Sequence, residues 1–191
     1  MANSKLIVVE GPQGAGKTTV TDYIRHSLTY TNLYRLSGTS DSSPEGLNKA
    51  KKMYEDLLEY LEKLENTSIN LLFDRTFFTE ENYCRLGKKQ YSFTEVYNKL
   101  LEKFSKLDFE IYYITLYLEN TEIYNQRLQR GEKADVAYAK FGAQKSIEQQ
   151  KVYLEMAEEI KEKYPNIKTV KIATDKDFEI IKNKVREFIG Y

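Results

Sequence analysis

The residues with the clearest chemical potential form a glycine-rich segment near the start of the chain. Residues 11–19 read Gly-Pro-Gln-Gly-Ala-Gly-Lys-Thr-Thr and directly follow the apolar run 6–9. This segment satisfies G-x-x-x-x-G-K-[ST], a pattern that cradles phosphate groups when it lies between a strand and a helix. Gly14 and Gly16 permit backbone conformations that other residues avoid, so successive N–H groups can turn towards one anion. The segment therefore predicts a phosphate-binding loop.

Each position of this loop has an expected task. We expect Lys17 to reach the β- and γ-phosphates of ATP, and Thr18 to offer its hydroxyl to Mg²⁺. The positive end of the following helix adds to the field that attracts the phosphates. The other residues that we expect around the nucleotide are Gly11, Gln13, Gly14, Ala15, Gly16 and Thr19.

A second group of polar residues, Asp74-Arg75-Thr76, follows the apolar run 71–73. The carboxyl end of a parallel strand is where open α/β sheets place their ligand crevice. Asp74 would hold Mg²⁺ there through water, and Arg75 would grip a phosphate. The competing interpretation is a surface Asp–Arg pair that caps the next helix.

Alternating strands and helices must position these two groups. Short apolar runs rich in β-favouring residues predict strands, and the longer stretches between them have helical spacing. Strands that alternate with helices indicate βαβ units, and hence a parallel sheet covered on both faces. We predict one α/β domain over 1–191. The predicted strands are 5–9, 32–36, 69–73, 110–118 and 168–172, and the predicted helices are 18–30, 44–65, 79–87, 93–107, 119–130, 143–163 and 175–189.

Composition excludes several classes of protein. The 191 residues carry 29 basic and 29 acidic side chains, so bulk charge cannot hold the chain to nucleic acid or anionic lipid. The longest apolar run, 111–118, is too short to cross a bilayer. One cysteine and one histidine rule out an internal disulfide and a cysteine-based or multi-histidine metal site. With no secretory signal visible, we expect a soluble cytoplasmic protein without membrane contact.

The two polar groups and their order resemble those of the thymidylate kinase and deoxynucleoside kinase superfamily. Members carry an "EG…GKST/GKTT" loop, matched here by 10–19, and a later "DRY", "DRS" or "ERS" element, matched by 74–76 with Tyr83 following. The run 111–118, the helix after it and 131–133 are similar to their strand, helix and arginine-bearing lid. The resemblance implies a P-loop kinase-type three-layer sandwich, with a central, mostly parallel five-stranded sheet and a helical lid at about 127–144.

The resemblance also implies roles for residues outside the phosphate loop. Arg127 and Arg130 lie at i and i+3 on one helix face, where either could neutralise charge on the transferred phosphoryl group. Thr174 and Asp175 occupy the place where members of this superfamily touch adenine. Asp175 is equally suited to cap the last helix.

The resemblance leaves the phosphate acceptor open between a deoxynucleoside and its monophosphate. A sugar hydroxyl needs a base, and Glu10 matches the carboxylate that deoxynucleoside kinases use, although thymidylate kinases often keep a glutamate there too. Gln13 departs from the Asp that is usual in thymidylate kinases. The helix at 46–64 lacks both the arginines of that branch and the base-reading Gln of the other. It offers Lys49, Lys51, Lys52 and Asn48 instead.

Tyrosines are the residues available for stacking on a base. Of the 16 in the chain, we single out Tyr34, Tyr54 and Tyr83, while most of the others are expected to pack. The leucine stripe of the helix at 44–65 could support a homodimer or be buried within one copy.

Three functions follow as hypotheses. The leading one is an ATP-dependent phosphotransferase for a small-molecule nucleoside or nucleotide, with Lys17, Arg75 and a lid arginine stabilising charge. The second is a P-loop kinase that acts on a nucleic-acid 5′-end or a modified base; the zero net charge argues against it. The third is a non-kinase ATP-binding switch. The guanine-reading pattern N-K-x-D is missing from the sequence, in which Asn183-Lys184 is followed by Val185-Arg186.

Overall fold

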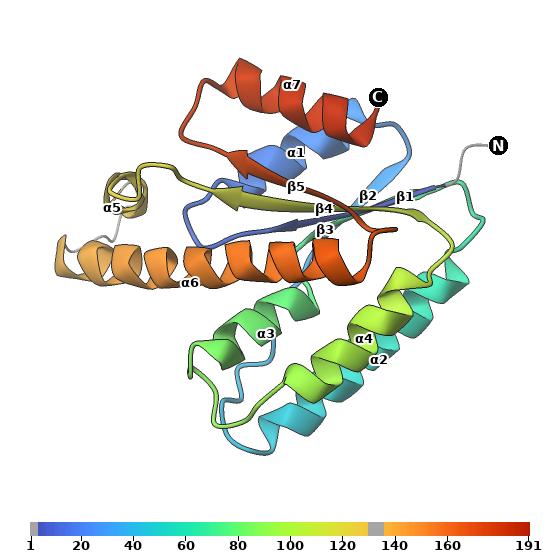
Figure 1. Ribbon diagram of the computed structural model, residues 1–191, viewed down its shortest axis with the longest axis horizontal. Helices are drawn as coiled ribbons and strands as arrows, with labels where there is room; N and C mark the ends of the chain where they lie inside the picture. Colours follow the sequence, from blue (N-terminus) through green and yellow to red (C-terminus); the bar gives the residue numbers. More distant parts are fainter. Residues whose placement is uncertain (1–3, 130–135) are drawn as a thin grey trace.

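The computed structural model describes residues 4–129 and 136–191, with side chains from 142 onwards in the second segment. Its centre is a five-stranded sheet in the order β2-β3-β1-β4-β5, in which every described pairing is parallel (Figure 1). This confirms the α/β architecture and its mostly parallel sheet. The strands are β1 (Lys5–Glu10), β2 (Thr31–Arg35), β3 (Asn70–Asp74), β4 (Glu110–Tyr117) and β5 (Lys168–Ala173).

Helices cover both faces of the sheet. In Figure 1, α1 and α7 lie on one face, α2, α3, α4 and α6 lie on the other, and α5 lies beyond the carboxyl ends of the strands. The three layers of the expected sandwich are therefore present. The helices are α1 (Lys17–Ser27), α2 (Gly46–Lys63), α3 (Phe77–Arg85), α4 (Thr94–Ser105), α5 (Ile123–Leu128), α6 (Val136–Lys163) and α7 (Phe178–Ile189).

The core consists of two apolar layers that the central strand separates. Alternate residues of β1 point to opposite faces, so Leu6 and Val8 join the layer under α2, α3, α4 and α6, while Ile7 and Val9 join the layer under α1 and α7. All four are completely buried. Continuous apolar strands are what a parallel sheet covered on both faces requires.

Strand register brings the polar ends of the central strands together. Val9 lies opposite Asp74 of β3, and Glu10 lies opposite Thr115 of β4. The phosphate loop leaves the sheet directly after Glu10, so the loop and Asp74 meet at the carboxyl edge of the sheet.

The expected elements are all present, with differences at helix ends. The first helix stops at Ser27, because Leu28 takes an extended conformation. The helix expected at 119–130 is only Ile123–Leu128, and α6 begins at Val136, earlier than the expected 143. Residues 130–135 of the expected lid lie outside the described part of the chain. Across the described residues, no helix is long and apolar enough to span a membrane.

The capping role suggested for Asp175 is wrong. The cap of α7 is Asp177, whose side chain accepts a hydrogen bond from the backbone N–H of Glu179. The carboxylate of Asp175 instead accepts from the backbone N–H groups of Glu119 (3.2 Å) and Asn120 (2.8 Å). These two hydrogen bonds fasten the turn before α5 to the turn after β5.

Candidate active site

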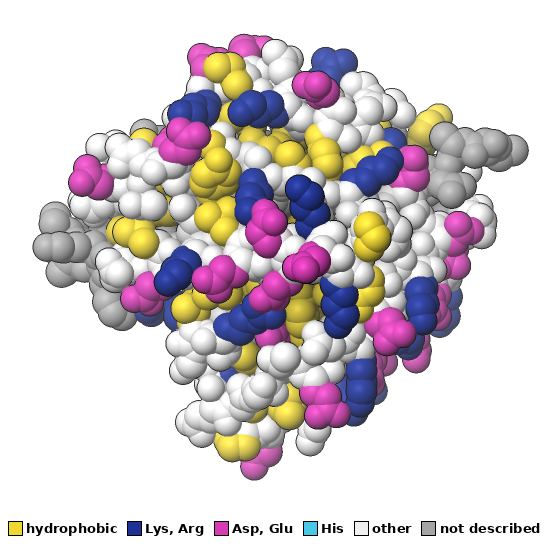
Figure 2. Space-filling view, viewed as in Figure 1, with side chains coloured by type: hydrophobic (Ala, Val, Ile, Leu, Met, Phe, Trp, Pro, Cys, Tyr) yellow, Lys and Arg dark blue, Asp and Glu magenta, His cyan; other side chains and the backbone are white. Residues whose placement is uncertain are grey.

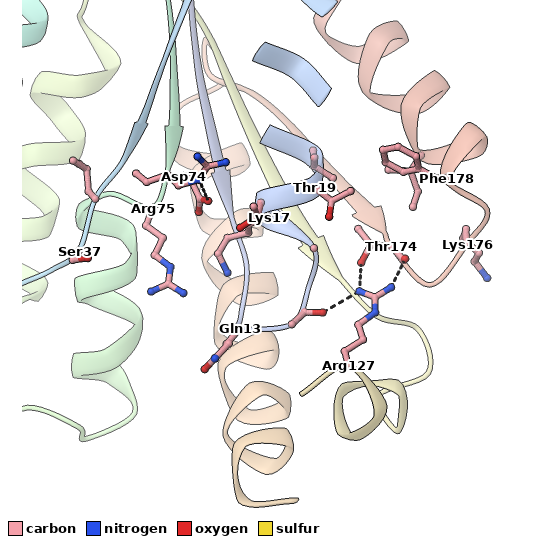
Figure 3. Close-up of a pocket in the computed structure, with 17 residues that line it drawn as sticks. Gln13, Lys17, Thr19, Ser37, Asp74, Arg75, Arg127, Thr174, Lys176 and Phe178 are labelled. Carbon is pink, nitrogen blue, oxygen red and sulfur yellow. Dashed lines mark hydrogen bonds and ion pairs between the residues drawn. The ribbon is translucent and has the colours of Figure 1, made fainter. Parts of the chain in front are cut away.

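A cleft of about 760 Å³ lies at the carboxyl edge of the sheet (Figure 3). Its lining comes from the phosphate loop, the first turns of α1, the ends of β2 and β3, α5, and the start of α7. The lining residues are Gln13, Gly14, Gly16, Lys17, Thr18, Thr19, Val20, Arg35, Leu36, Ser37, Asp74, Arg75, Arg127, Thr174, Lys176, Phe178 and Ile181.

Two glycines give the phosphate loop its shape. Gly16 has φ +94° and is the N-cap of α1, a left-handed conformation that disfavours any residue with a Cβ. At Gly11 a Cβ would come within 2.7 Å of the carbonyl oxygen of Leu116, so only glycine lets the loop pass this close to β4. The loop therefore begins and ends on positions that need glycine.

Lys17 is folded over the loop that precedes it. Its Nζ donates to the carbonyl oxygens of Gly11 (2.6 Å) and Pro12 (2.9 Å), and the residue is buried. Burial, together with the nearby charge of Arg75, lowers the pKa of Lys17 to about 8, while Glu10 and Asp74 oppose the shift. The ammonium lies where it can exchange these carbonyl partners for phosphate oxygens.

Asp74 is paired with a cation that sequence reasoning missed. Arg35, at the end of β2, places its Nε 3.4 Å from Asp74 Oδ2 and its Nη2 2.5 Å from Asp22 Oδ1. Since β2 and β3 pair with Arg35 opposite Asp74, the register itself creates the contact. Nothing in the sequence near Arg35 marks it, because its two partners are distant along the chain.

The oxygen atoms of this cleft suit a hard cation such as Mg²⁺. Thr18 and Asp74 contribute a hydroxyl and a carboxylate to the lining. Among the described residues there is no cluster of three or more His, Cys, Asp or Glu that could hold a metal. Mg²⁺ commonly binds through one or two protein oxygens plus substrate phosphates and water, so this sparse donor set suits it.

Arg75 adopts a left-handed backbone conformation, with φ +73°, between β3 and α3. Its N–H donates to the carbonyl of Val9 at 3.4 Å. Figure 3 shows the Arg75 and Lys17 side chains pointing the same way from neighbouring parts of the site. The two cations expected to bind phosphate groups thus face one space.

Glu10 is completely buried and does not belong to the cleft lining. Its Oε1 accepts from the backbone N–H (2.9 Å) and hydroxyl (3.2 Å) of Thr76, and its Oε2 accepts from the Thr79 hydroxyl (2.7 Å). Burial raises the pKa of Glu10 to about 7, although the Thr79 hydrogen bond and the charge of Lys17 favour the carboxylate. The side chain is held against the start of α3.

Arg127 joins the phosphate loop to the end of β5. Its guanidinium donates to the carbonyl oxygens of Gly14 (2.9 Å) and Thr174 (2.6 Å), and to the Thr174 hydroxyl (3.2 Å). Figure 3 shows this bridge beside the loop. Its companion in the expected lid, Arg130, lies outside the described residues.

The turn after β5 contributes differently from the expectation. Thr174 lines the cleft, and its hydroxyl donates to the carbonyl of Ala15 at 2.6 Å. Asp175 is outside the lining, because its carboxylate accepts hydrogen bonds from the backbone of the turn before α5. Lys176 and Phe178 line the cleft instead. Neither was expected from the sequence, in which no motif marks the residues around Asp177, the N-cap of α7.

The residues expected around the acceptor are not part of the cleft lining. Tyr34 stacks on Phe73 with 5.0 Å between ring centroids, and Tyr54 is buried in the core. Tyr83 lies below the ammonium of Lys88. None of the three belongs to the cleft lining in the described structure. The helix lysines are exposed, as is Asn48; Lys49 pairs with Asp41 and Lys52 with Asp56.

Positive charge is concentrated inside the cleft. Arg35, Arg75 and Lys17 line one part of it, and Asp74 is the single acid among the lining residues. On the face seen in Figure 2, by contrast, basic and acidic side chains are interspersed. A cleft whose lining is mainly basic, on a molecule of zero formal charge, attracts a polyanionic ligand to that place.

Comparisons with known proteins identify the fold. No protein-family model and no curated protein sequence matches the chain. Many solved structures do match, and three of them each align with 95% or more of this chain. Thymidylate kinase from Candida albicans has a TM-score of 0.64 at 19% identity, over 99% of this chain and 92% of its own. The YorR protein of Bacillus subtilis, solved with phosphorylated GDP, has a TM-score of 0.63 at 19% identity, over 96% and 95%.

The third structure is deoxyadenosine kinase from M. mycoides, with a TM-score of 0.51 at 20% identity, over 95% of this chain and 98% of its own. The fold of this chain is therefore that of the P-loop nucleoside and nucleotide kinases, which confirms the resemblance seen in the sequence at the level of architecture.

Proposed function

We propose that the chain is a phosphotransferase that moves the γ-phosphoryl group of ATP to a deoxynucleoside or a deoxynucleoside monophosphate. One observation carries the proposal: Lys17 of the phosphate loop, Asp74 and Arg75 line a single cleft at the carboxyl edge of a parallel sheet. Donor and acceptor phosphates can meet only where such groups converge, because this chemistry relies on positioning and charge neutralisation.

The donor half of the site follows from the loop. The N–H groups of the loop and of the first turn of α1 cradle the β- and γ-phosphates, and Lys17 exchanges the carbonyls of Gly11 and Pro12 for phosphate oxygens. Thr18 and Asp74 would hold Mg²⁺, which would supply charge neutralisation to the phosphates. Thr174 is the proposed contact for the adenine end, and Arg127 the proposed lid arginine.

Of the two acceptors, the monophosphate is better supported. A sugar hydroxyl must give up its proton to a base, yet Glu10 is outside the cleft lining and both of its oxygens already accept hydrogen bonds. A monophosphate is largely ionised at neutral pH, since its second pKa is about 6, and needs positive charge instead. Arg75 supplies that charge from within the cleft.

A product assay tests the proposal. Purified protein with Mg-ATP is offered thymidine and thymidine monophosphate in parallel, followed by the other bases. We expect diphosphate formation from a monophosphate, and we expect Lys17→Met to lower the rate by at least about a hundredfold. Lys51→Met, which changes an exposed lysine of α2, is the matched control.

Other outcomes would revise the proposal in defined ways. Phosphorylation of the nucleoside alone would make Glu10 the general base and require it to enter the cleft. Binding of ATP without transfer to any nucleoside or nucleotide would overturn the proposed acceptor class.

A further inference from the structure

A chain of hydrogen bonds runs from α6 to the end of β1. The Tyr153 hydroxyl donates to Thr79 Oγ1 at 3.2 Å, and the Thr79 hydroxyl donates in turn to Glu10 Oε2 at 2.7 Å. The other carboxylate oxygen of Glu10 accepts the backbone N–H of Thr76 at 2.9 Å. All four residues are buried. Each member orients the next, because a buried polar group without its partner is costly.

The chain ends on the residue that follows Arg75. A left-handed backbone costs a non-glycine residue roughly 1–2 kcal/mol and persists only when the surroundings enforce it. Here the end of β1 holds both sides of the turn. Val9 accepts the N–H of Arg75 at 3.4 Å, and Glu10 accepts the N–H of Thr76. The hydrogen bond to Glu10, at 2.9 Å, is shorter than the one to Val9 and is the stronger restraint.

The far end of the chain is fixed to the phosphate loop. Ser146, two turns before Tyr153 on α6, donates its hydroxyl to the carbonyl of Gln13 at 2.7 Å. Residues seven apart lie on nearly the same helix face, so one face of α6 contacts both the loop and Thr79. The position of Tyr153 is thereby set relative to the donor half of the site.

We propose that Tyr153 and Thr79 are positioning residues that act through Glu10 to hold the left-handed turn presenting Arg75 to the acceptor. Neither side chain lines the cleft, so neither touches substrate in this arrangement. The proposal rests on the proposed function for the identity of the ligand that Arg75 grips. The geometry of the turn does not depend on that function.

Three variants and one control test the proposal. Tyr153→Phe removes the hydroxyl, Thr79→Val removes the middle link, and Thr79→Ser retains it. The control is Tyr97→Phe, which removes a buried hydroxyl that has no hydrogen-bond partner among the described residues and whose ring packs against Phe78 of α3. Tyr97 thus matches Tyr153 in chemistry and burial, but it lies outside the chain of hydrogen bonds.

Steady-state kinetics with the acceptor varied, together with calorimetric binding of ADP, separates positioning from general damage. We expect kcat/KM for the acceptor to fall about fivefold in Tyr153→Phe and about tenfold or more in Thr79→Val, the cost of one and two lost hydrogen bonds. Thr79→Ser should recover most of the loss. The Kd for ADP should stay within about twofold, because the phosphate loop keeps its own contacts. Equal effects in Tyr153→Phe and Tyr97→Phe, or a parallel loss of ADP binding, would overturn the proposal.

Crystal structures of the wild type and Thr79→Val give a readout that needs no activity. We expect the Thr76 N–H to lose its fixed distance to Glu10 and Arg75 to leave the left-handed region in the variant. An unchanged turn would refute the positioning role even in an active enzyme. An inactive wild type whose turn shifts in Thr79→Val would instead refute the proposed function and leave the positioning role standing.

Discussion

Asp74 and Arg35 form an ion pair across the ends of β3 and β2, with 3.4 Å between carboxylate and guanidinium. The acid proposed to hold Mg²⁺ is thus bound to a cation of the protein. Arg35 also contacts Asp22, so it has a second partner to retain when the metal binds Asp74.

This pair predicts opposite responses to two substitutions. Asp74→Asn should lower kcat by at least about a hundredfold, because metal-based charge stabilisation supplies several kcal/mol. Arg35→Gln frees the carboxylate, so half-maximal activity should need less Mg²⁺ than in the wild type. A magnesium titration of activity measures both. Asp22→Asn removes the other partner of Arg35, so the guanidinium should hold Asp74 more tightly and half-maximal activity should need more Mg²⁺ than in the wild type; a lower requirement there would contradict this assignment.

The buried carboxyl group of Glu10 predicts a pH-dependent stability. Its pKa is about 7 in the folded chain against 4.5 for an unperturbed glutamate, so the folded state binds the proton more tightly. The resulting stabilisation is complete below about pH 4.5 and is lost as the pH rises to about 7. The pKa of Lys17 is lowered to about 8, so its titration changes the stability in a separate, alkaline pH range.

Glu10→Gln isolates this effect in urea unfolding experiments at several pH values. As the pH rises from 4.5 to 7, the free energy of unfolding of the variant should increase relative to that of the wild type by on the order of 3 kcal/mol, the free-energy equivalent of the pKa difference. The glutamine can still accept from Thr76, and the Thr79 hydroxyl can rotate to accept from its amide. Parallel stability curves for the two proteins would refute the prediction. The ionisable side chains facing Glu10 are Lys17, Arg75, Tyr54, Tyr97, Tyr113 and Tyr153.

Arg127 predicts a defect confined to the donor nucleotide. Arg127→Met removes the hydrogen bonds that tie Gly14 to Thr174, so the rim of the phosphate loop loses its support. We expect the Kd for ATP to rise about tenfold, the cost of charge-assisted hydrogen bonds in a partly exposed site. Calorimetric titration measures it, with Arg25→Met on the exposed face of α1 as the control. Unaltered ATP affinity would leave Arg127 with no role in the donor site.

Glycine positions predict a contrast in stability. Gly87→Ala should lower the free energy of unfolding by about 1 kcal/mol, because φ is +71°. The new Cβ adds no clash, because open space surrounds it. Gly11→Ala also brings a Cβ within 2.7 Å of a backbone oxygen, and should cost about 2–4 kcal/mol in addition to weakening ATP binding. Chemical denaturation with and without ATP distinguishes the two. Similar losses in both variants would show that the loop can move away from β4.

Most of the fold was predictable from local patterns. The five strands are short apolar runs bounded by polar turns, and their observed limits lie within one residue of those expected. Helix ends were less predictable where long-range contacts decide them. The turn before α5 is fastened by Asp175, which is 55 residues from Asn120, and no local pattern reports such a bond.

The candidate site was likewise predictable only in part. The phosphate loop and Asp74-Arg75 were predicted because each consists of consecutive residues that form a recognisable motif. Arg35 was missed because strand pairing brings it to Asp74. The burial of Glu10 was also hidden, since Thr76 and Thr79 reach it from the start of α3, and Tyr153 of α6 is connected to it only through Thr79.

The contacts of α6 have a thermodynamic consequence. This one helix hydrogen-bonds the phosphate loop through Ser146, α5 through Gln150 and Tyr124, and α3 through Tyr153. A ligand at the phosphate loop that displaced α6 would therefore also move Thr79, and through it Glu10 and the turn at Arg75. If the proposed donor and acceptor bind there, their affinities should be linked, and linkage is reciprocal: the factor by which the donor tightens the acceptor must equal the factor by which the acceptor tightens the donor.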